Sequence, residues 1–383
     1  MATGFPPQKG GIPTYTWEIC KQLCGLGYAI IVLAPKQKEA RSFDRYLMNR
    51  YGIRVYRVSA RYGSREVQFF IYGLYCRFKY KVSLVFATIW FPCGIIAFML
   101  SKLCSLPYVI AVHAYEVFAS RDTQRNRIRT RFLPLIPRIF NRAYRIFCVS
   151  HFTRRRVIAC GAREDKVQVF LNGVDPLRYY PTECKNGLRR RYPGLEGKRI
   201  LITVAELVDY KGQDTVLKAL PAILAKHPDI VYAIIGEGVY KSRLKELTET
   251  AHLQNQVLFV GKAPDEELNE WYNEADIYVM PSRFKPGTAD VEGFGISFVE
   301  ANACNLPCIG GNSGGVPDAV LHKVTGELVD PENADELADT IIRFLDSERL
   351  RRMYGENGRK RVEQELSWEA IVKRMAGVFN EAF

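Results

Sequence analysis

The strongest chemical signal in the sequence is the glycine-rich stretch EGFGISFVEANACNLPCIGGNSGGVP at residues 292–317. Glu292 and Glu300 are about two helical turns apart, so the pattern predicts that both carboxylates lie on one face of a single helix that begins at Glu292. Gly293 and Gly295 would leave backbone N–H groups uncovered at the start of that helix, where unpaired donors and the helix dipole attract anions. The stretch therefore predicts a phosphate-binding turn; the alternative is a surface helix with two solvated glutamates.

Three further positions could assist such a site. Lys211 follows a predicted strand after a short loop and could neutralise a diphosphate, although a solvated loop lysine is the simpler interpretation. His113 comes directly after another predicted strand, where ligands collect in open sheets; a packed structural histidine is the alternative. Gly10 and Gly11 open a predicted helix and could cradle phosphate from a second side, but a glycine pair is commonly only a turn.

The sequence predicts no resident metal ion. Its ten cysteines form no C-x-x-C pair, its five histidines do not cluster with them, and it contains no D-x-D triplet. We therefore expect neither a zinc site nor a disulfide framework, and a reducing compartment fits this pattern.

The elements that would position these residues alternate between strand and helix in two series. Strands are predicted at residues 29–34, 82–88, 108–112 and 145–149, and then at 200–205, 230–235, 257–260, 277–280 and 307–310. Apolar strands that alternate with helices indicate an α/β fold with parallel, doubly wound sheets. We expect an N-terminal domain over 1–173, a C-terminal domain over 174–366 and a final helical segment over 367–383, with ligands in a cleft at the carboxyl ends of the strands.

The first series lacks a strand where this fold needs one. A glycine-rich turn such as Gly10-Gly11 normally joins the end of a strand to a helix, but only residues 1–5 remain to supply such a strand. The sequence therefore predicts that the first strand of the N-terminal domain is missing. The same opening residues lack the basic and apolar regions of a signal peptide.

The net charge of +13 is unevenly distributed. Residues 1–191 hold 33 Lys and Arg against 10 Asp and Glu, whereas residues 192–383 hold 21 against 31. The first half could therefore meet an anionic surface, although a bias of solvated faces is the alternative. No nucleic-acid-binding module is recognisable. Residues 82–101 carry no charge and are long enough to span a bilayer, but Pro92 and Gly94 interrupt them and favour a strand, a turn and a packed helix.

Taken together, these motifs resemble the retaining glycosyltransferases of family 4, which have the two-domain GT-B fold. The resemblance covers nearly the whole chain and rests on FPPQKGGIPTY near the start, VSHFTRRRV at 149–157, NGVD at 172–175, KGQDTVLKAL at 211–220 and EGFGISFVEANACNLPCIGGNSGGVPD at 292–318. The form DVEGFGI is most similar to the phosphatidylinositol mannosyltransferase type, whose donor is GDP-mannose.

The resemblance implies three catalytic residues. His113 would face the donor sugar near the reacting carbon, Lys211 would grip the diphosphate, and Glu292 would hold the hydroxyls of the sugar. Glu300 would accept hydrogen bonds from the ribose, and the backbone near Gly261 would meet the base. The substrate-binding positions implied in this way are Gly10, Gly11, Gly236, Gly261, Lys262, Gly293, Phe294, Gly295 and Glu300.

The expected activity is the metal-independent, retaining transfer of a hexose, with mannose favoured, from a GDP- or UDP-linked sugar to a lipid-linked or glycan acceptor in glycolipid or polysaccharide synthesis. The expected location is the cytoplasm, peripheral at the membrane face, with the basic N-terminal domain on anionic lipid. Two departures from the family favour an alternative, a weak or inactive nucleotide-sugar-binding or scaffold protein. The first strand, which supports the Gly10-Gly11 loop, is missing. Glu206 stands where the family usually carries an arginine, and an acid beside two phosphates weakens binding. A hydrolase or epimerase on the same fold is a further alternative.

Overall fold

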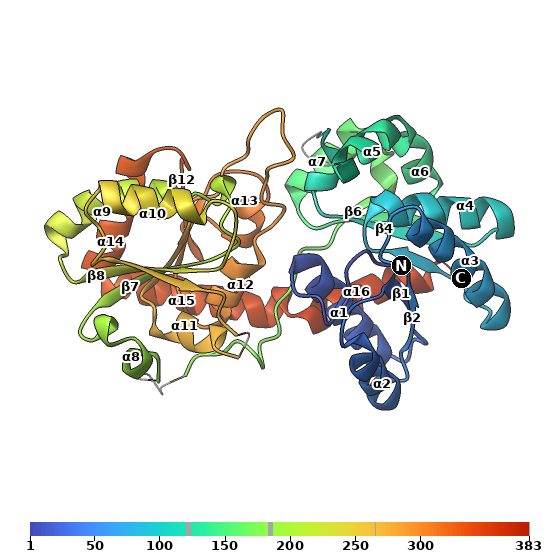
Figure 1. Cartoon of the computed structure of the whole chain (residues 1–383), viewed down its shortest axis with the longest axis horizontal. Helices are drawn as coiled ribbons and strands as arrows, with labels where there is room; N and C mark the ends of the chain where they lie inside the picture. Colours follow the sequence, from blue (N-terminus) through green and yellow to red (C-terminus); the bar gives the residue numbers. More distant parts are fainter. Residues whose placement is uncertain (120–123, 183–186, 265, 383) are drawn as a thin grey trace. The chain divides into compact units, whose positions relative to one another are not determined.

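A computed structural model describes residues 1–119, 124–182, 187–264 and 266–382. The chain forms two compact α/β units (Figure 1). Unit 1 comprises Met1–Asn172, Gly287–Ala289 and Trp368–Phe383, and unit 2 comprises Gly173–Pro286 and Asp290–Ser367.

Unit 2 is built on a six-stranded parallel sheet with the strand order β12-β11-β10-β7-β8-β9. Its strands are β7 (Arg199–Val204), β8 (Ile230–Ile235), β9 (Val257–Gly261), β10 (Ile277–Met280), β11 (Cys308–Gly311) and β12 (Gly326–Val329). Its helices are α8 (Gly187–Arg191), α9 (Gln213–Lys226), α10 (Lys241–Thr250), α11 (Leu268–Glu274), α12 (Ile296–Ala303), α13 (Val316–Ala319), α14 (Ala334–Asp346) and α15 (Glu348–Arg361). The strand order reverses direction between β7 and β10, which is the point where doubly wound sheets bind ligands at their carboxyl ends.

The central strands of unit 2 are apolar because helices cover both of their faces. All six residues of β8 are buried, without the alternation that a half-exposed strand would show. Helices α9 and α14 pack together, and Leu217, Leu220 and Ile341 join the core that this sheet shares with them. This core holds the loops that follow β7 and β10 at one edge.

Unit 1 has its strands in two separate sheets. Two strands pair as β1-β2, and four pair in the order β3-β4-β5-β6, all in parallel. The strands are β1 (Ile31–Pro35), β2 (Arg54–Val58), β3 (Val85–Ala87), β4 (Tyr108–Val112), β5 (Arg145–Cys148) and β6 (Val167–Val169). The helices are α1 (Gly11–Gly25), α2 (Ala40–Tyr51), α3 (Ser64–Lys79), α4 (Ile95–Cys104), α5 (Gln124–Phe132), α6 (Ile136–Arg142), α7 (His151–Ala159) and α16 (Trp368–Asn380). The backbone of Met1 hydrogen-bonds to Phe86 and Thr88 beside β3, and the N–H of Ala2 donates to the carbonyl of Leu33 in β1, at the position where the sequence predicts a missing strand.

The last helix, α16, packs within unit 1 against α1. The ring of Phe379 lies 5.8 Å from Phe86 and 5.7 Å from Phe147, and Tyr28 Oη donates a hydrogen bond to the carbonyl of Ala376 over 3.2 Å. Aromatic contacts of this kind add to the apolar area that each ring buries.

The uncharged stretch at residues 82–101 folds as β3, a short turn and the start of α4. Within the described part of the chain, none of the helices combines the length and the apolar character that a membrane crossing requires.

Candidate functional site

Lys211 and Glu292 meet at the carboxyl-terminal edge of the unit 2 sheet. Lys211 closes a short 3-10 turn, Asp209–Lys211, after β7, and Glu292 lies in the loop that follows β10. The Nζ atom of Lys211 lies 2.5 Å from Oε2 of Glu292, and each side chain is only 14% exposed. Two of the predicted catalytic residues therefore come together at the point where the strand order reverses.

The loops after β7 and β10 touch at Gly212. This residue has φ +80°, and a Cβ atom there would lie 2.1 Å from the carbonyl oxygen of Pro281. Only glycine fits this close approach. Gly212 also precedes the first residue of α9 as its N-cap.

The charge of Lys211 is fixed by its surroundings. Burial by itself lowers the pKa of this lysine, but the carboxylate of Glu292 and the nearby Tyr210 and Glu206 together raise that pKa above its ordinary value. Lys211 is therefore a cation at neutral pH. Glu206 is exposed, and its carboxylate is close enough to be one of the charges that raise this pKa.

The prediction that Glu292 and Glu300 share one helical face is wrong. Helix α12 begins only at Ile296, because Gly295 adopts φ +93° at its N-cap. A residue in this left-handed conformation ends the helical geometry, and so Glu292 lies in the preceding loop. The loop position lets Glu292 reach Lys211.

The turn before α12 presents backbone donors. Within the described residues, no hydrogen bond engages the N–H groups of Gly293, Phe294 and Gly295. The side chain of Phe294 is buried, so it anchors the turn. Unpaired N–H groups at the start of a helix attract anions.

The glycine pair Gly314-Gly315, before α13, has a packing role. The N–H of Gly315 donates to the carbonyl of Glu292 over 2.8 Å, and a Cβ atom on Gly315 would lie 2.0 Å from the carbonyl oxygen of Gly293. On Gly314, a Cβ atom would lie 2.5 Å from the carbonyl oxygen of Glu292. Both glycines therefore let the loop before α13 support the turn that carries Glu292.

Glu300 lies in the middle of α12 and pairs with a tyrosine that the sequence did not single out. Oη of Tyr272, on α11, donates to Oε2 of Glu300 over 2.7 Å. Burial first, and the carboxylate of Glu300 second, raise the pKa of Tyr272, so its hydroxyl stays protonated. Tyr272 holds Glu300 in one orientation, and no spacing in the sequence pairs the two.

Gly236 and Gly261 meet at the ends of β8 and β9. The N–H of Gly236 donates to the carbonyl of Gly261 over 2.8 Å, and a Cβ atom on Gly236 would lie 1.9 Å from the carbonyl oxygen of Ala205. Close packing against Ala205 therefore requires a glycine at position 236, whether or not this residue binds a ligand. The side chain of Lys262 is exposed beside them.

His113 follows β4 in unit 1, so it lies in a different unit from Lys211 and Glu292. Its Nε2 lies 2.9 Å from the carbonyl oxygen of Thr88, to which it donates, and its backbone N–H donates to Glu116 Oε1 over 3.1 Å. Burial lowers the pKa of His113 to about 4, although the Thr88 carbonyl acts against this shift. His113 is therefore neutral at pH 7, with Nδ1 left as an acceptor.

Gly10 and Gly11 lie in unit 1 at the start of α1. Gly10 is the N-cap with φ +133°, a conformation open to glycine, and Gly11 is the first helical residue. One turn later, Tyr15 places its ring 4.7 Å from the ring of His113. The fold thus connects the start of α1 with His113 through a buried tyrosine that the sequence analysis missed.

An arginine at the unit 2 site was also missed. The guanidinium of Arg283, after β10, bonds to the carboxylate of Asp214 and donates to the carbonyl of Asp209 over 3.0 Å. These contacts tie the β10 loop to the turn that carries Lys211. Among the described residues, no group of three or more His, Cys, Asp or Glu is placed to hold a metal ion.

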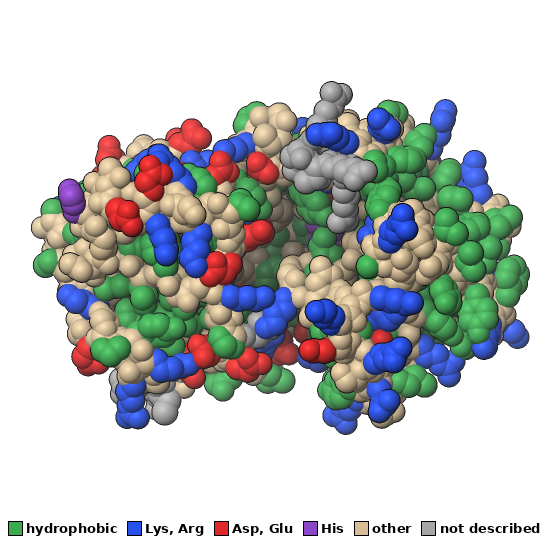
Figure 2. Space-filling model, in the orientation of Figure 1, with side chains coloured by type: hydrophobic (Ala, Val, Ile, Leu, Met, Phe, Trp, Pro, Cys, Tyr) green, Lys and Arg blue, Asp and Glu red, His purple; other side chains and the backbone are tan. Residues whose placement is uncertain are grey.

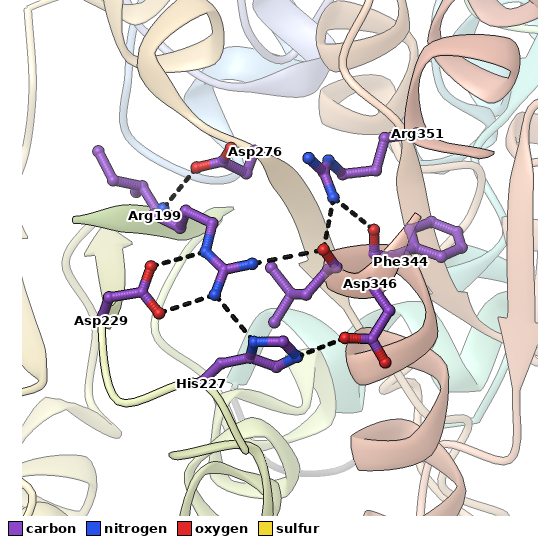
Figure 3. A network of polar contacts seen from close by, with 9 residues as sticks. Arg199, His227, Asp229, Asp276, Phe344, Asp346 and Arg351 are labelled. Carbon is purple, nitrogen blue, oxygen red and sulfur yellow. Dashed lines mark hydrogen bonds and ion pairs between the residues drawn. The ribbon is translucent and has the colours of Figure 1, made fainter. Parts of the chain in front are cut away.

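A second charged cluster lies at the opposite, amino-terminal ends of β7 and β8 (Figure 3). Arg199 donates to both carboxylate oxygens of Asp229 over 2.7 Å each, and to Nδ1 of His227 over 2.8 Å. Nε2 of His227 lies 3.0 Å from Asp346, and Arg199 also reaches the carbonyl of Leu345 over 3.3 Å. Each charge in this cluster faces a partner within it.

Comparison with known proteins places the chain in a family. Two family models match, "Glycosyl transferases group 1" over residues 187–361 and "Glycosyltransferase Family 4" over residues 9–178. The chain is 31% identical to the GDP-mannose-dependent alpha-(1-6)-phosphatidylinositol monomannoside mannosyltransferase of Mycobacterium tuberculosis, over 98% of this chain and 96% of that protein.

Solved structures show the same fold. A glycosyltransferase from Rickettsia africae matches with a TM-score of 0.82 at 19% identity, over 100% of this chain and 97% of that one. Anabaena HepE in complex with UDP and glucose matches with a TM-score of 0.78 at 20% identity, over 99% of each chain. The two doubly wound units, the GT-B fold of these neighbours and the near full-length similarity in sequence lead to one conclusion: this chain belongs to the family 4 glycosyltransferases.

Proposed function

We propose that this glycosyltransferase transfers mannose from GDP-mannose to a lipid-linked or glycan acceptor, with retention of configuration and without a metal ion. The observation that carries the proposal is the buried cation Lys211, held by Glu292 next to the unpaired N–H groups before α12. Mannose and GDP are favoured because the mycobacterial relative is a GDP-mannose-dependent mannosyltransferase.

The proposed chemistry needs charge stabilisation at the leaving group. The bond between the anomeric carbon and the diphosphate oxygen breaks, and the acceptor oxygen bonds to that carbon from the same face. The acceptor proton passes to the departing phosphate oxygen, so the products are GDP and the mannoside. Lys211 and the N–H groups of Gly293 and Gly295 would stabilise the growing negative charge, and fixed donors in such a site supply a large share of the rate.

Glu292 and Glu300 would bind the donor's hydroxyl groups. A diphosphate that attracts Lys211 leaves Glu292 with acceptor capacity for the sugar, and Glu300 is already oriented by Tyr272 for the ribose. We propose that His113, neutral with Nδ1 left as an acceptor, offers a hydrogen bond to substrate at the end of β4 within unit 1.

Acceptor lipid would be reached through the surface of unit 1. Exposed apolar side chains lie on α3 and α4, where Phe78 is 72% and Leu103 is 65% exposed. Lys79 and Lys102 lie beside them in the last turns of these helices. In the view of Figure 2, most of the Asp and Glu side chains lie over unit 2, whereas unit 1 shows separate Lys and Arg side chains among hydrophobic ones. We propose that this face docks peripherally on anionic lipid at the cytoplasmic side of a membrane.

The test of activity offers labelled GDP-mannose and UDP-glucose, in turn, to purified protein with vesicles that contain phosphatidylinositol. Transfer to lipid that is lost in Lys211→Ala and Glu292→Ala supports the proposal. Binding of GDP without any turnover would instead support the nucleotide-sugar-binding alternative. The anomeric coupling constant of the product reports retention directly, and transfer that EDTA abolishes and magnesium restores would refute the metal-free mechanism.

The test of docking measures sedimentation with anionic vesicles at rising ionic strength. Screening should strip the protein from lipid as the salt concentration increases. Phe78→Ser and Leu103→Ser should weaken binding further, whereas Val239→Ser, at a still more exposed apolar position in unit 2, should not. Binding that ignores both salt and the two unit 1 substitutions would contradict the docking proposal.

A further inference from the structure

Polar side chains on α11 reach residues of α12 in unit 2. Oη of Tyr272 donates to Oε2 of Glu300 over 2.7 Å, and Sγ of Cys304 donates to Oδ1 of Asn269 over 3.2 Å. Asn269 and Tyr272 are three positions apart on α11, and Glu300 and Cys304 are four apart on α12, so each pair shares one face of its helix. Hydrogen bonds therefore join the two helices next to the carboxylate of Glu300.

Tyr272 and Glu300 differ in their access to a ligand. Tyr272 is fully buried, whereas Glu300 is partly exposed. A bound nucleotide can therefore touch the carboxylate but not the phenol. Burial and the neighbouring carboxylate keep the hydroxyl of Tyr272 protonated, and a carboxylate only accepts hydrogen bonds, so the phenol proton is committed to Oε2. Any effect of Tyr272 on a ligand must therefore pass through Glu300.

The position of Tyr272 is itself fixed by packing. The centre of its ring lies 5.7 Å from that of Tyr179 and 6.1 Å from that of Tyr278. A buried side chain that packs against two other rings is restricted to one rotamer. The carboxylate of Glu300 is therefore held in place before a nucleotide binds, and less side-chain entropy remains to be lost on binding.

We propose that Tyr272 is a positioning residue that determines the selectivity of the site for the ribose diol of the donor nucleotide. The inference rests on the proposed GDP-mannose site, in which Glu300 binds the ribose. With one oxygen engaged by Tyr272, the carboxylate presents its remaining acceptor capacity to the diol in one direction. A nucleotide without the 2′- and 3′-hydroxyl groups leaves this oriented acceptor without its donors, and a site built for hydroxyl groups rejects such an analogue.

The test measures the binding of GDP and of 2′,3′-dideoxy-GDP by titration calorimetry. The unsubstituted chain should bind GDP about 10–100-fold more tightly than the dideoxy analogue, as expected for hydrogen bonds to a charged group. In Tyr272→Phe this ratio should fall by about fivefold or more, because GDP binds less tightly while the affinity for the analogue stays within about twofold. In transfer assays KM for the donor should rise with kcat unchanged, because the ribose is remote from the reacting carbon.

The matched control is Tyr278→Phe. Tyr278 is also fully buried, and its Oη lies 2.6 Å from Oγ of Ser297, one turn before Glu300 on α12. Loss of this hydroxyl should keep the ratio of the two affinities within about twofold, although it also removes a buried hydrogen bond. A second control places Tyr272→Phe in a Glu300→Ala background, where it should have no further effect on GDP binding, because Tyr272 acts through Glu300.

An unchanged affinity ratio in Tyr272→Phe, with normal GDP binding, would overturn the role of Tyr272 and leave the proposed function intact. An equal fall of the ratio in Tyr278→Phe would also overturn it, because the effect would then be a general loosening of α12. A chain that binds neither nucleotide would overturn the proposed function as well.

If Tyr272→Phe does not fold, ¹³C NMR of the tyrosine-labelled, unsubstituted chain replaces it. The Cζ signal of Tyr272, identified by its change in Glu300→Ala, should move when GDP is added. The dideoxy analogue should move it less than about half as far, because the analogue cannot donate to the carboxylate that the phenol contacts. Equal shifts with the two nucleotides would contradict the proposal.

Discussion

The two edges of the unit 2 sheet carry similar charged groups in different arrangements. At the amino-terminal edge, Arg199, Asp229 and His227 are linked to one another, and His227 also faces Asp346 (Figure 3). At the carboxyl-terminal edge, Lys211 and Glu292 also pair, but the N–H groups of the adjacent turn have no partner among the described residues.

The contrast separates the edge proposed to bind the donor from an edge that holds a closed ion-pair cluster. An ion pair and a shifted pKa occur at both edges, since the pKa of Arg199 and that of Lys211 are both raised. Ion pairs alone therefore do not separate structure from function. The distinguishing features at the carboxyl-terminal edge are glycine turns, unmet donors and the reversal of strand order.

The largest effect that would distinguish the two edges is expected from Lys211→Ala. We expect the rate of mannosyl transfer to fall about 10²–10³-fold, because the variant loses the cation beside the departing diphosphate. Steady-state transfer assays measure it. Lys218→Ala, an exposed lysine of α9, should keep the full rate. If Lys211→Ala keeps more than about a third of the rate, the carboxyl-terminal edge is not the diphosphate site.

The second prediction concerns the amino-terminal edge, where a substitution should lower stability and leave activity unchanged. Arg199→Met should lower the free energy of unfolding of unit 2 by about 2 kcal/mol, because Asp229, His227 and the Leu345 carbonyl all lose a donor. Calorimetry should show the unit 2 midpoint about 4–8 °C lower. Transfer at 15 °C should be unchanged.

The matched control for Arg199 is Arg352→Met. Arg352 also pairs with a carboxylate, Glu356, but its side chain is 78% exposed, and such pairs contribute little. The thermal midpoint of unit 2 in Arg352→Met should stay within about 1 °C of that of the unsubstituted chain. A loss of transfer in Arg199→Met at low temperature would show that the amino-terminal edge takes part in the reaction.

Sequence reasoning found the elements whose pattern is local. The strands at Tyr108–Val112, Ile230–Ile235 and Ile277–Met280 are confirmed at both ends, because unbroken apolar runs bounded by turns mark buried parallel strands. The strand β12 was missed, since Gly326–Val329 includes a glutamate that pairs with Arg343.

Sequence reasoning failed where the outcome depends on distant contacts. Helical periodicity placed Glu292 in a helix, but the left-handed Gly295 and the contact of Gly315 with this turn exclude it. The pairs Lys211–Glu292 and Tyr272–Glu300 join residues on different loops and helices, so no local spacing encodes them.

A third substitution tests whether the charge of Glu206 affects GDP binding at the carboxyl-terminal edge. Glu206→Arg should tighten the binding of GDP about three- to tenfold, because it replaces an exposed negative charge near Lys211 with a positive one. Titration calorimetry at low and high salt measures the gain, which should shrink with screening. Glu348→Arg, a charge reversal at the start of α15, should leave GDP binding unchanged. Weaker binding in Glu206→Arg would mean that Glu206 itself contacts the nucleotide.

The smallest expected effect is a difference between the two edges in how their charged groups make stability depend on pH. The pKa of Asp229 is lowered, chiefly by its hydrogen bonds from Arg199. A carboxyl group with a lowered pKa in the folded state adds stability that is complete above its unfolded pKa, near 4, and is lost as the pH falls below it. The Asp229 side chain is 39% exposed, so solvent screening keeps this contribution below about 1 kcal/mol. Lys211 has a raised pKa, so its contribution is complete below its unfolded pKa and disappears only in strong alkali.

Thermal midpoints of the chain and of Asp229→Asn should therefore differ slightly at pH 6 and converge toward pH 3. A difference that stays constant from pH 6 to pH 3 would show that Asp229 stabilises unit 2 through hydrogen-bond geometry and not through its charge.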